Sequence, residues 1–468
     1  MTVPLEFIEN RIFDDIAIGD GAELARTLCH EDIELFAVMS GDANPAHLDD
    51  EFAKRDPYHH VVAHGMWGAS LISAVLGTRL PGPGTIYVSQ SLEFRSPVAL
   101  GDTITVGVRV KEKHPATKHI ILDCKCSNQR GEVVIAGVAE VIAPTLKVRR
   151  PRSLLPEFHL RSPGQRYRQL IEATRGLPPI RTAVVHPCDG VSLAAAFEAR
   201  DAGLINPVLV GPRRKIETAA GEAKLVIDGI EIIDMPHSHA AADEAVRLAR
   251  TGQVEALMKG SLHTDELMAA VVDPDTGLRT DRRMSHVFAL DVPHYPKPLF
   301  ITDAAVNIDP TLEEKRDIVQ NAIDLCRALG IEAPKVAILS AVETVSAKMK
   351  STVDAAALCK MAERGQIEGG ILDGPLAFDN AVSKEAAKTK HIVSNVAGDA
   401  DILVAPNLEA GNMLAKQLIY LAEAEAAGLV LGARVPIVLT SRSDSTLARL
   451  ASCALAQLFV HNGKAARP

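Results

Sequence analysis

The chain carries its densest group of reactive side chains in two short stretches: Ser40-Gly41-Asp42-Ala43-Asn44-Pro45-Ala46-His47 and, seventeen residues after His47, His64-Gly65-Met66. Asp42 and His47 stand five residues apart across a proline-containing turn, where their side chains can converge on one point. Such a pair suits the addition or removal of water across a double bond conjugated to a thioester. One group must activate the water and another must protonate the α-carbon. A donor must also hold the developing enolate oxygen.

These residues resemble the signature of the MaoC-type (R)-specific enoyl-CoA hydratases, a family with the hot-dog fold. The signature reads Gly-Asp-x-Asn-Pro-x-His, then five residues, then a small residue. Gly41 to His47 match it, and Ala53 occupies the small position. The resemblance covers roughly residues 10–145. It implies an enzyme that interconverts 2-enoyl-CoA and (R)-3-hydroxyacyl-CoA.

The resemblance also implies roles for single residues. Asp42 and His47 would be the catalytic pair, and Asn44 between them would contact the substrate. The backbone N–H of Gly65 would form the oxyanion hole, at the start of the helix that the hot-dog sheet wraps. Ser73, two turns along that helix, would orient the pair.

The same residues also suit an ordinary turn, because Asp, Asn, Gly and Pro are the common turn formers. The offsets of His47, Ala53 and the His64-Gly65-Met66 element favour the hydratase site over a turn alone. His59 and His60 are interpreted as exposed loop histidines. No second ligand cluster has zinc-like spacing, so no metal is expected.

The composition limits the class of protein. A chain of 468 residues should hold two or three domains. Its hydrophobic content of 47% suits a globular enzyme, and its net charge of −9 disfavours nucleic acid and anionic membranes as partners. The seven scattered cysteines are expected to be reduced thiols in a cytoplasmic protein. The N-terminus lacks the features of a signal peptide, and no apolar run reaches transmembrane length.

The patterning indicates an α+β hot-dog domain over residues 1–145. Helices are expected over 31–39 and 64–80, the second one mostly apolar and rich in small residues that allow close packing. Alternating runs rich in Val, Ile and Thr predict four strands, over 85–97, 102–111, 119–128 and 132–144. Residues 146–165 hold prolines and arginines without periodicity and are expected to be a linker.

Residues 166–468 alternate short apolar runs with helical patterns, which predicts an α/β domain with a mostly parallel sheet. Strands are expected over 182–185, 207–210, 256–258, 287–290, 299–302, 336–340, 370–372, 402–405 and 437–439. Helices are expected over 240–251, 312–329, 348–364, 411–427 and 445–460. Ligands of such sheets bind at the carboxyl ends of the strands.

Five loops at these strand ends have an unusual composition, and together they resemble the phosphate acetyl/butyryltransferase family over about residues 165–465. They begin at Met258, Thr302, Asp373, Ala405 and Leu439. The resemblance implies reversible acyl transfer between CoA and inorganic phosphate. No phosphate-binding loop of an NTPase and no dinucleotide fingerprint is present in the sequence.

The second resemblance implies its own site residues. Arg442 would clamp phosphate through two hydrogen bonds, and Ser441 would hydrogen-bond the thiol or the carbonyl oxygen. Further substrate contacts are expected from a larger set: Lys259, Arg279, Arg283, Ser285, Asp303 and Asn412.

The chain departs from the acetyltransferase branch at one position. That branch has an acidic residue, proposed as the base for the thiol, six positions after the arginine; here the position is Ala448. The stretch from Thr440 to Ser445 looks more like the butyryltransferase branch. Acetyl or butyryl preference therefore stays open. The base stays open as well, with Asp444, Asp303 and Asp379 as alternatives.

The sequence favours a bifunctional acyl-CoA enzyme. CoA thioesters and inorganic phosphate are its expected substrates, without a tightly bound cofactor, and the family resemblances imply a homo-oligomer. One alternative is a metal- and NAD-dependent dehydrogenase, since the second fold resembles that of the isocitrate/isopropylmalate dehydrogenases. Another is that one half is a non-catalytic CoA-binding module.

Overall fold

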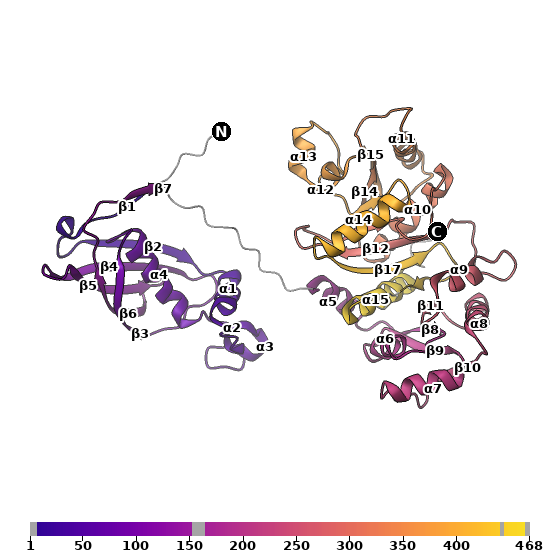
Figure 1. Cartoon of the computed structure of the whole chain (residues 1–468), viewed down its shortest axis with the longest axis horizontal. Helices are drawn as coiled ribbons and strands as arrows, with labels where there is room; N and C mark the ends of the chain where they lie inside the picture. The colour runs from indigo at the N-terminus through magenta and orange to yellow at the C-terminus, as the bar shows by residue number, and fades with distance from the viewer. Residues whose placement is uncertain (1–6, 152–163, 440–443, 464–468) are drawn as a thin grey trace. The chain divides into compact units, whose positions relative to one another are not determined.

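The computed structural model describes residues 7–151, 164–439 and 444–463 and divides the chain into two compact units, Met1–Arg161 and Ser162–Pro468 (Figure 1). Each unit has its own hydrophobic core. All seven cysteines are free, in agreement with the expected reduced thiols. Among the described residues, no helix combines the length and the apolar character needed to span a membrane.

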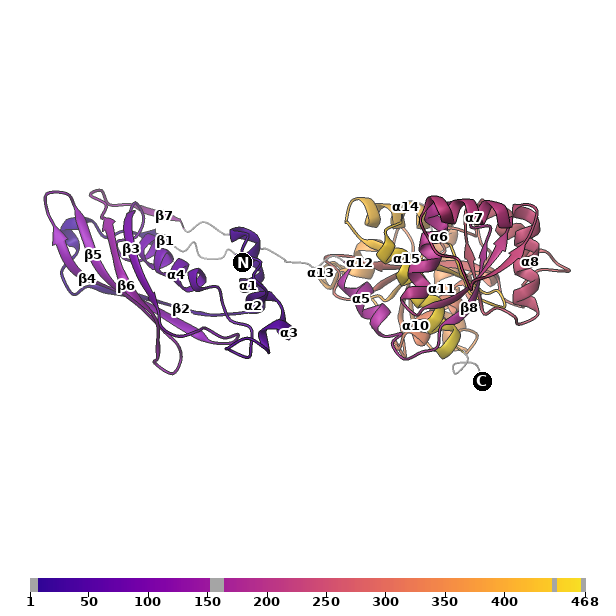
Figure 2. The ribbon, with the colours of Figure 1, turned by 90° about the horizontal axis from the view of Figure 1, so that it is seen from below.

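The first unit is a five-stranded antiparallel sheet with the order β2-β4-β5-β6-β3, packed along one long helix, α4 (Figures 1 and 2). The strands are β2 (Gly21–Thr27), β3 (Ile86–Phe94), β4 (Thr103–His114), β5 (His119–Ser127) and β6 (Val133–Ile142). The helices are α1 (His30–Ser40), α2 (Pro45–Leu48), α3 (Asp50–Ala53) and α4 (Gly65–Thr78), and a 3-10 turn spans Phe13–Asp15. This is the helix and sheet order expected of a hot-dog domain.

Small residues let α4 approach the sheet closely. A Cβ at Gly68 would lie 2.6 Å from Ile135 Cδ1, so any side chain here would force the Ile135 side chain to move. Ile72, Val75 and Leu76 on the same helix are fully buried. The predicted close packing of this helix is thereby confirmed.

The edge strand β2 was not predicted from the sequence. It pairs with β4 in the register Gly21↔Arg109 to Thr27↔Thr103. Its sequence, Gly-Ala-Glu-Leu-Ala-Arg-Thr, contains one large apolar residue and lacks the β-branched residues that mark a strand, except at its end. Pairing with β4 rather than its own composition makes it a strand.

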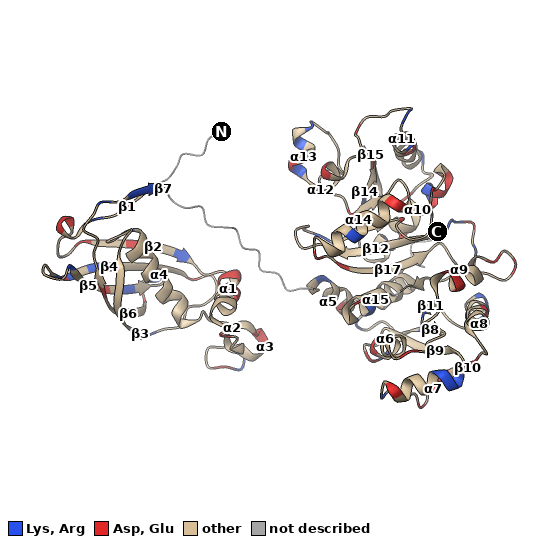
Figure 3. Cartoon of the chain, in the orientation of Figure 1, with Lys and Arg blue, Asp and Glu red and all other residues tan. Residues whose placement is uncertain are grey.

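A short two-stranded ribbon lies outside this sheet. The strand β1 (Phe7–Glu9) pairs antiparallel with β7 (Arg149–Pro151). The basic strand β7 is drawn in blue in Figure 3. The Arg149 side chain forms an ion pair with Glu9 at 2.7 Å and a cation–π contact with the Phe7 ring. The expected linker over 146–165 therefore begins with residues that pair with the N-terminal segment; residues 152–163 lie outside the described ranges.

The second unit contains an eleven-stranded mixed sheet with the order β10-β9-β8-β11-β18-β17-β12-β13-β16-β14-β15. Its strands are β8 (Ile180–Val185), β9 (Ile205–Gly211), β10 (Glu231–Asp234), β11 (Ala256–Lys259), β12 (Ser285–Asp291), β13 (Leu299–Thr302), β14 (Lys335–Leu339), β15 (Ile371–Leu376), β16 (Ile402–Val404), β17 (Glu425–Leu431) and β18 (Ile437–Val438). Its helices are α5 (Gln165–Glu172), α6 (Gly190–Asp201), α7 (Arg213–Glu222), α8 (Ser238–Arg250), α9 (Thr264–Val272), α10 (Leu312–Ala328), α11 (Lys350–Glu363), α12 (Phe378–Val382), α13 (Lys384–Thr389), α14 (Leu408–Tyr420) and α15 (Thr446–Asn462).

The prediction of a mostly parallel sheet needs a correction at the centre. The pairs β18–β17, β17–β12 and β12–β13 are antiparallel, whereas the outer pairs are parallel. Three reversals in succession make the two parallel halves run in opposite directions. The loops after β11 and after β13 consequently leave opposite edges of the sheet, rather than one common edge.

The predicted helix over 411–427 is also wrong in its last part. The helix α14 ends at Tyr420, and Glu425 to Leu431 form β17 instead. The alanines of this stretch favour helix by propensity alone. Pairing of β17 with β12 over seven residues overrides that preference. The strand β10 is a further element that was not predicted.

Candidate active sites

In the first unit, a sharp turn between α1 and α2 presents the predicted hydratase residues. Gly41 ends α1 in the left-handed conformation, with φ of 75°, which glycine adopts without strain. The side chain of Asn44 then accepts a hydrogen bond from the Ala46 N–H at 3.1 Å and caps α2. Asn44 thus has a structural task, while its predicted substrate contact stays a prediction.

The turn brings Asp42 and His47 together with a third side chain, His64. One carboxylate oxygen or ring nitrogen from each residue lies within 4.8 Å of the others. The rings of His47 and His64 pack with their centroids 4.0 Å apart. Asp42 is exposed, His47 half-buried and His64 buried.

Backbone carbonyls fix which ring nitrogens carry protons. His47 Nδ1 lies 2.8 Å from the Val62 carbonyl oxygen, and His64 Nε2 lies 2.9 Å from the Asp42 carbonyl oxygen. A carbonyl only accepts, so each of these nitrogens donates its N–H. In the neutral rings, His47 Nε2 and His64 Nδ1 therefore hold the lone pairs. A base at Nε2 of His47 is what the predicted chemistry requires.

Gly65 and Ser73 lie on α4, at different distances from this turn. Gly65 is the first residue of the helix, where N–H groups have no intrahelical acceptor and remain able to bind an oxyanion. A Cβ at Gly65 would lie 3.1 Å from the Phe94 ring, so a side chain would crowd this position. Ser73 is exposed and lies about 12 Å further along the helix axis. No hydrogen bond among the described residues joins Ser73 to Asp42 or His47, and its orienting role stays a prediction.

In the second unit, a cavity of about 1360 Å³ lies along the central antiparallel strands. Its lining includes residues from the loops after β11 and after β13 as well as from β12 and β17. Its lining includes three of the predicted contacts, Lys259, Arg283 and Asn412, and also Asp444 and Ala448. Ser441 and Arg442 lie outside the described residues, but Leu439 and Asp444 on either side of them line the cavity.

Arg283 is held in a fixed orientation at this cavity. Its Nε donates to Asn307 Oδ1 at 2.6 Å, and its guanidinium lies 3.1 Å from Glu314. Asn307 in turn donates to the Asp303 carboxylate at 2.5 Å. An oriented guanidinium of this kind suits recognition of a phosphate.

The structure does not bring Asp303, Ser285 or Arg279 to the cavity wall. The Asp303 carboxylate accepts hydrogen bonds from the N–H groups of residues 305–307, at 2.9 to 3.1 Å, and thereby shapes the loop after β13. Ser285 is fully buried and its hydroxyl lies 3.0 Å from the amide nitrogen of Asn321. Arg279 is exposed on its loop.

Of the three open candidates for the thiol's base, only Asp444 is among the residues that line the cavity. Asp303 is engaged by its loop, and Asp379 lies 3.4 Å from Lys390 beside α12. This position makes Asp444 the best placed of these three candidates.

His286 is a cavity residue that sequence reasoning missed. It sits inside β12, it is 3% exposed, and its Nδ1 has no hydrogen-bond partner among the described residues. A histidine within an apolar run has no spacing or neighbour that would distinguish it from an ordinary core residue. The sequence assigned no role to the His64 side chain for a related reason. Its hydrogen-bond partner is the backbone carbonyl of Asp42, which lies 22 positions earlier in the chain.

Burial lowers the pKa of His286 to about 4, although the nearby Asp303 carboxylate acts in the opposite direction. Between pH 6.5 and 4 the unfolded chain therefore binds a proton that the folded chain does not. Lowering the pH through this range should destabilise the second unit by up to about 1.4 kcal/mol per pH unit through this residue. Unfolding midpoints of the wild type and of His286→Gln would show it: the wild type should lose more stability than the variant. A difference independent of pH would contradict the expectation.

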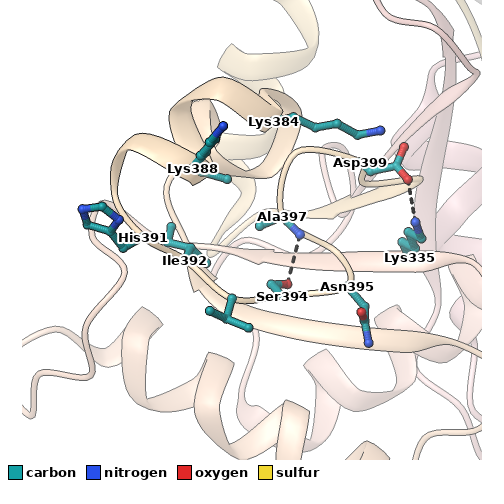
Figure 4. A pocket seen from close by; sticks show the side chains of 11 residues that line it. Lys335, Lys384, Lys388, His391, Ile392, Ser394, Asn395, Ala397 and Asp399 are labelled. Carbon is teal, nitrogen blue, oxygen red and sulfur yellow. Dashed lines mark hydrogen bonds and ion pairs between the residues drawn. The ribbon is translucent and has the colours of Figure 1, made fainter.

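A separate hollow lies beside α13 in the second unit (Figure 4). Lys384 and Lys388 border it, and Lys335 bonds Asp399 at 2.5 Å within it. It contains none of the residues predicted to bind substrate, so the central cavity remains the candidate active site.

Each of the two units matches a known protein family. The family model described as "MaoC like domain" matches residues 17–123, and the model described as "Phosphate acetyl/butaryl transferase" matches residues 238–457. A phosphate acetyltransferase of Rhizobium meliloti is 63% identical over 302 residues, which cover 64% of this chain and 96% of that protein. The chain belongs to the phosphate acetyl/butyryl transferase family.

Other members of this family show the same coverage. A phosphate butyryltransferase of Clostridium beijerinckii is 39% identical over 301 residues, covering 64% of this chain and all of that protein. The structure of a branched-chain phosphotransacylase from Enterococcus faecalis V583 is 31% identical, with a TM-score of 0.53, and covers 60% of this chain and 99% of that one. The predicted fusion of a MaoC-like domain to a phosphate acetyl/butyryl transferase domain is confirmed. The likeness to isocitrate/isopropylmalate dehydrogenases stays a prediction.

Proposed function

We propose that this chain is a bifunctional acyl-CoA enzyme. Its first unit would hydrate 2-enoyl-CoA to (R)-3-hydroxyacyl-CoA, and its second would transfer an acyl group reversibly between CoA and inorganic phosphate. The observation that carries the first activity is the convergence of Asp42 and His47 beside the N-terminus of α4. The second rests on the family membership and on the cavity that Arg283 and Lys259 line.

In the hydratase site, each group has a chemical task. His47 Nε2, whose lone pair is free because Nδ1 donates to Val62, takes a proton from water as the oxygen adds to C3. The N–H of Gly65 donates to the thioester oxygen and stabilises the enolate. The proton that His47 takes from water is relayed through the Asp42 carboxylate to the α-carbon of the enolate, so that one water adds as OH at C3 and as H at the α-carbon.

In the transferase cavity, the CoA thiolate attacks the carbonyl carbon of an acyl phosphate, and phosphate leaves with the bonding electron pair. Arg283 and Lys259 supply the positive charge that stabilises the phosphate oxygens. Asp444 is the proposed acceptor of the thiol proton. Acetyl is the proposed acyl group, because the relative at 63% identity is a phosphate acetyltransferase, whereas the butyryltransferase is 39% identical.

Self-association is part of the proposal. The edge strand β3 exposes three apolar side chains, Ile86, Val88 and Phe94, the last of them beside Gly65. An unpaired edge with exposed apolar side chains favours association with another copy. We therefore propose a homo-oligomer, and the free cysteines fit a reducing, cytoplasmic location.

The test is an activity assay of the whole chain with three substrate sets. Crotonyl-CoA in water should lose its enoyl-thioester absorbance. Acetyl-CoA with phosphate should release CoA, and faster than butyryl-CoA does. Absence of phosphate-dependent CoA release would exclude the transferase, and an unchanged crotonyl-CoA spectrum would exclude the hydratase.

A further inference from the structure

The Asp42, His47 and His64 cluster has properties that acid–base catalysis alone does not require. Three ligand-type atoms from residues far apart in the sequence lie within 4.8 Å of one another. Ligands of one Zn²⁺ ion lie about 3 to 4 Å apart, as follows from bond lengths near 2.1 Å. Binding of all three to a single ion therefore needs the ligand atoms to approach by about 1 Å and the two imidazole rings, whose centroids lie 4.0 Å apart, to turn toward the ion.

Both histidines already have the outer contacts that metal-binding histidines use. His47 donates its Nδ1–H to the Val62 carbonyl, and His64 donates its Nε2–H to the Asp42 carbonyl. Such bonds to backbone carbonyls fix the tautomer and raise the basicity of the opposite nitrogen. His47 Nε2 and His64 Nδ1 are thereby the nitrogens that keep a lone pair for coordination.

An independent observation points to a ligand at this place. His64 is 2% exposed, and its Nδ1 has no hydrogen-bond partner among the described residues. A buried acceptor without a partner costs free energy, and native structures rarely leave one unsatisfied. A metal ion bound by the neighbouring carboxylate and imidazole would satisfy this nitrogen.

We propose that Asp42, His47 and His64 form a binding site for a divalent transition-metal ion, with Zn²⁺ as its expected occupant. The ligand atoms are a carboxylate oxygen of Asp42, Nε2 of His47 and Nδ1 of His64. Two imidazoles and one carboxylate suit Zn²⁺, whereas Mg²⁺ and Ca²⁺ take oxygen ligands. Three protein ligands leave the fourth position of the ion open.

Metal binding would oppose hydration at the same place. The ion takes the lone pairs that Asp42 and His47 need for proton transfer, so Zn²⁺ should inhibit the hydratase and spare the acyl exchange. This consequence rests on the proposed hydratase function. The binding of the ion itself does not.

The experiment measures Zn²⁺ binding to the full chain by competition with a chromogenic chelator, and the visible spectrum of bound Co²⁺. The wild type should bind one equivalent whose affinity falls about a hundredfold or more in His64→Phe and in Asp42→Asn. His30→Gln is the matched control. Like His64→Phe, it removes a histidine near a carboxylate, because His30 is exposed and lies 3.5 Å from the Glu34 carboxylate. It should bind as the wild type does.

Equal affinity in the wild type and both cluster variants would overturn the proposal. Asp42 is exposed, so Asp42→Asn decides the question if His64→Phe fails to fold. Hydration by the wild type is then followed with and without Zn²⁺, and again after the chelator is added. A chain that binds Zn²⁺ through these residues but never hydrates crotonyl-CoA would refute the proposed hydratase and leave the metal site intact.

Discussion

Replacing His47 by Gln should reduce the rate of crotonyl-CoA hydration by about 10² to 10⁴, the range that general acid–base catalysis contributes. Glutamine fills similar space and can still donate to the Val62 carbonyl, which His47 Nδ1 contacts at 2.8 Å. It offers no lone pair that can accept a proton from water. The measurement is the loss of enoyl-thioester absorbance catalysed by the purified full chain.

The partner variant, Asp42→Asn, should cause a loss of the same order, since it removes the carboxylate that lies within 4.8 Å of the imidazole. His60→Gln is a suitable control because His60 is an exposed histidine in the segment between α3 and α4. In all three proteins the phosphate-dependent release of CoA should be unchanged, which shows that the second unit is folded. Full hydration by both site variants would refute the assignment of the pair.

The turn between α1 and α2 was predictable from the sequence because its chemistry and its geometry are local. Gly41, Asn44 and the proline between Asn44 and His47 dictate a turn through their own conformational preferences, and the reactive residues lie on that turn. His64 takes part through a hydrogen bond to the backbone carbonyl of Asp42, and no side-chain pattern encodes such a contact. The sequence therefore predicted the pair but not the ring that packs against it.

The central cavity of the second unit was less predictable because it depends on how distant strands pair. Period and composition located most strands, but they carry no information about direction. The predicted helix over 411–427 covers the start of the antiparallel strand β17, and β17 itself was not predicted, so the reversal of the sheet was missed. Without that reversal the sequence could not show that Lys259, at the end of β11, and Arg283, before β12, line one cavity, or that Asp303 bonds within the loop after β13.

Replacing Arg283 by Gln should raise the KM for phosphate about 10- to 100-fold, with a smaller effect on the KM for acetyl-CoA. A hydrogen bond to a charged group contributes about 1.5 to 3 kcal/mol, and 1.4 kcal/mol corresponds to a factor of ten. Two contacts fix the guanidinium in place, one with Asn307 at 2.6 Å and one with Glu314 at 3.1 Å. Because the guanidinium is already oriented, little reorganisation is needed when phosphate binds. Removing Arg283 therefore loses most of the binding free energy of this contact.

Phosphate-dependent CoA release, measured over a range of phosphate concentrations, tests this expectation. Arg434→Gln is the matched control, because Arg434 is exposed and does not line the central cavity.

Loss of Arg283 also frees Glu314, whose negative charge then repels phosphate and adds to the increase in KM. The double variant Arg283→Gln/Glu314→Gln should recover part of the lost affinity. If the KM for phosphate is unaltered in Arg283→Gln, the cation that holds phosphate lies elsewhere on the cavity wall, and Lys259 becomes the residue to replace.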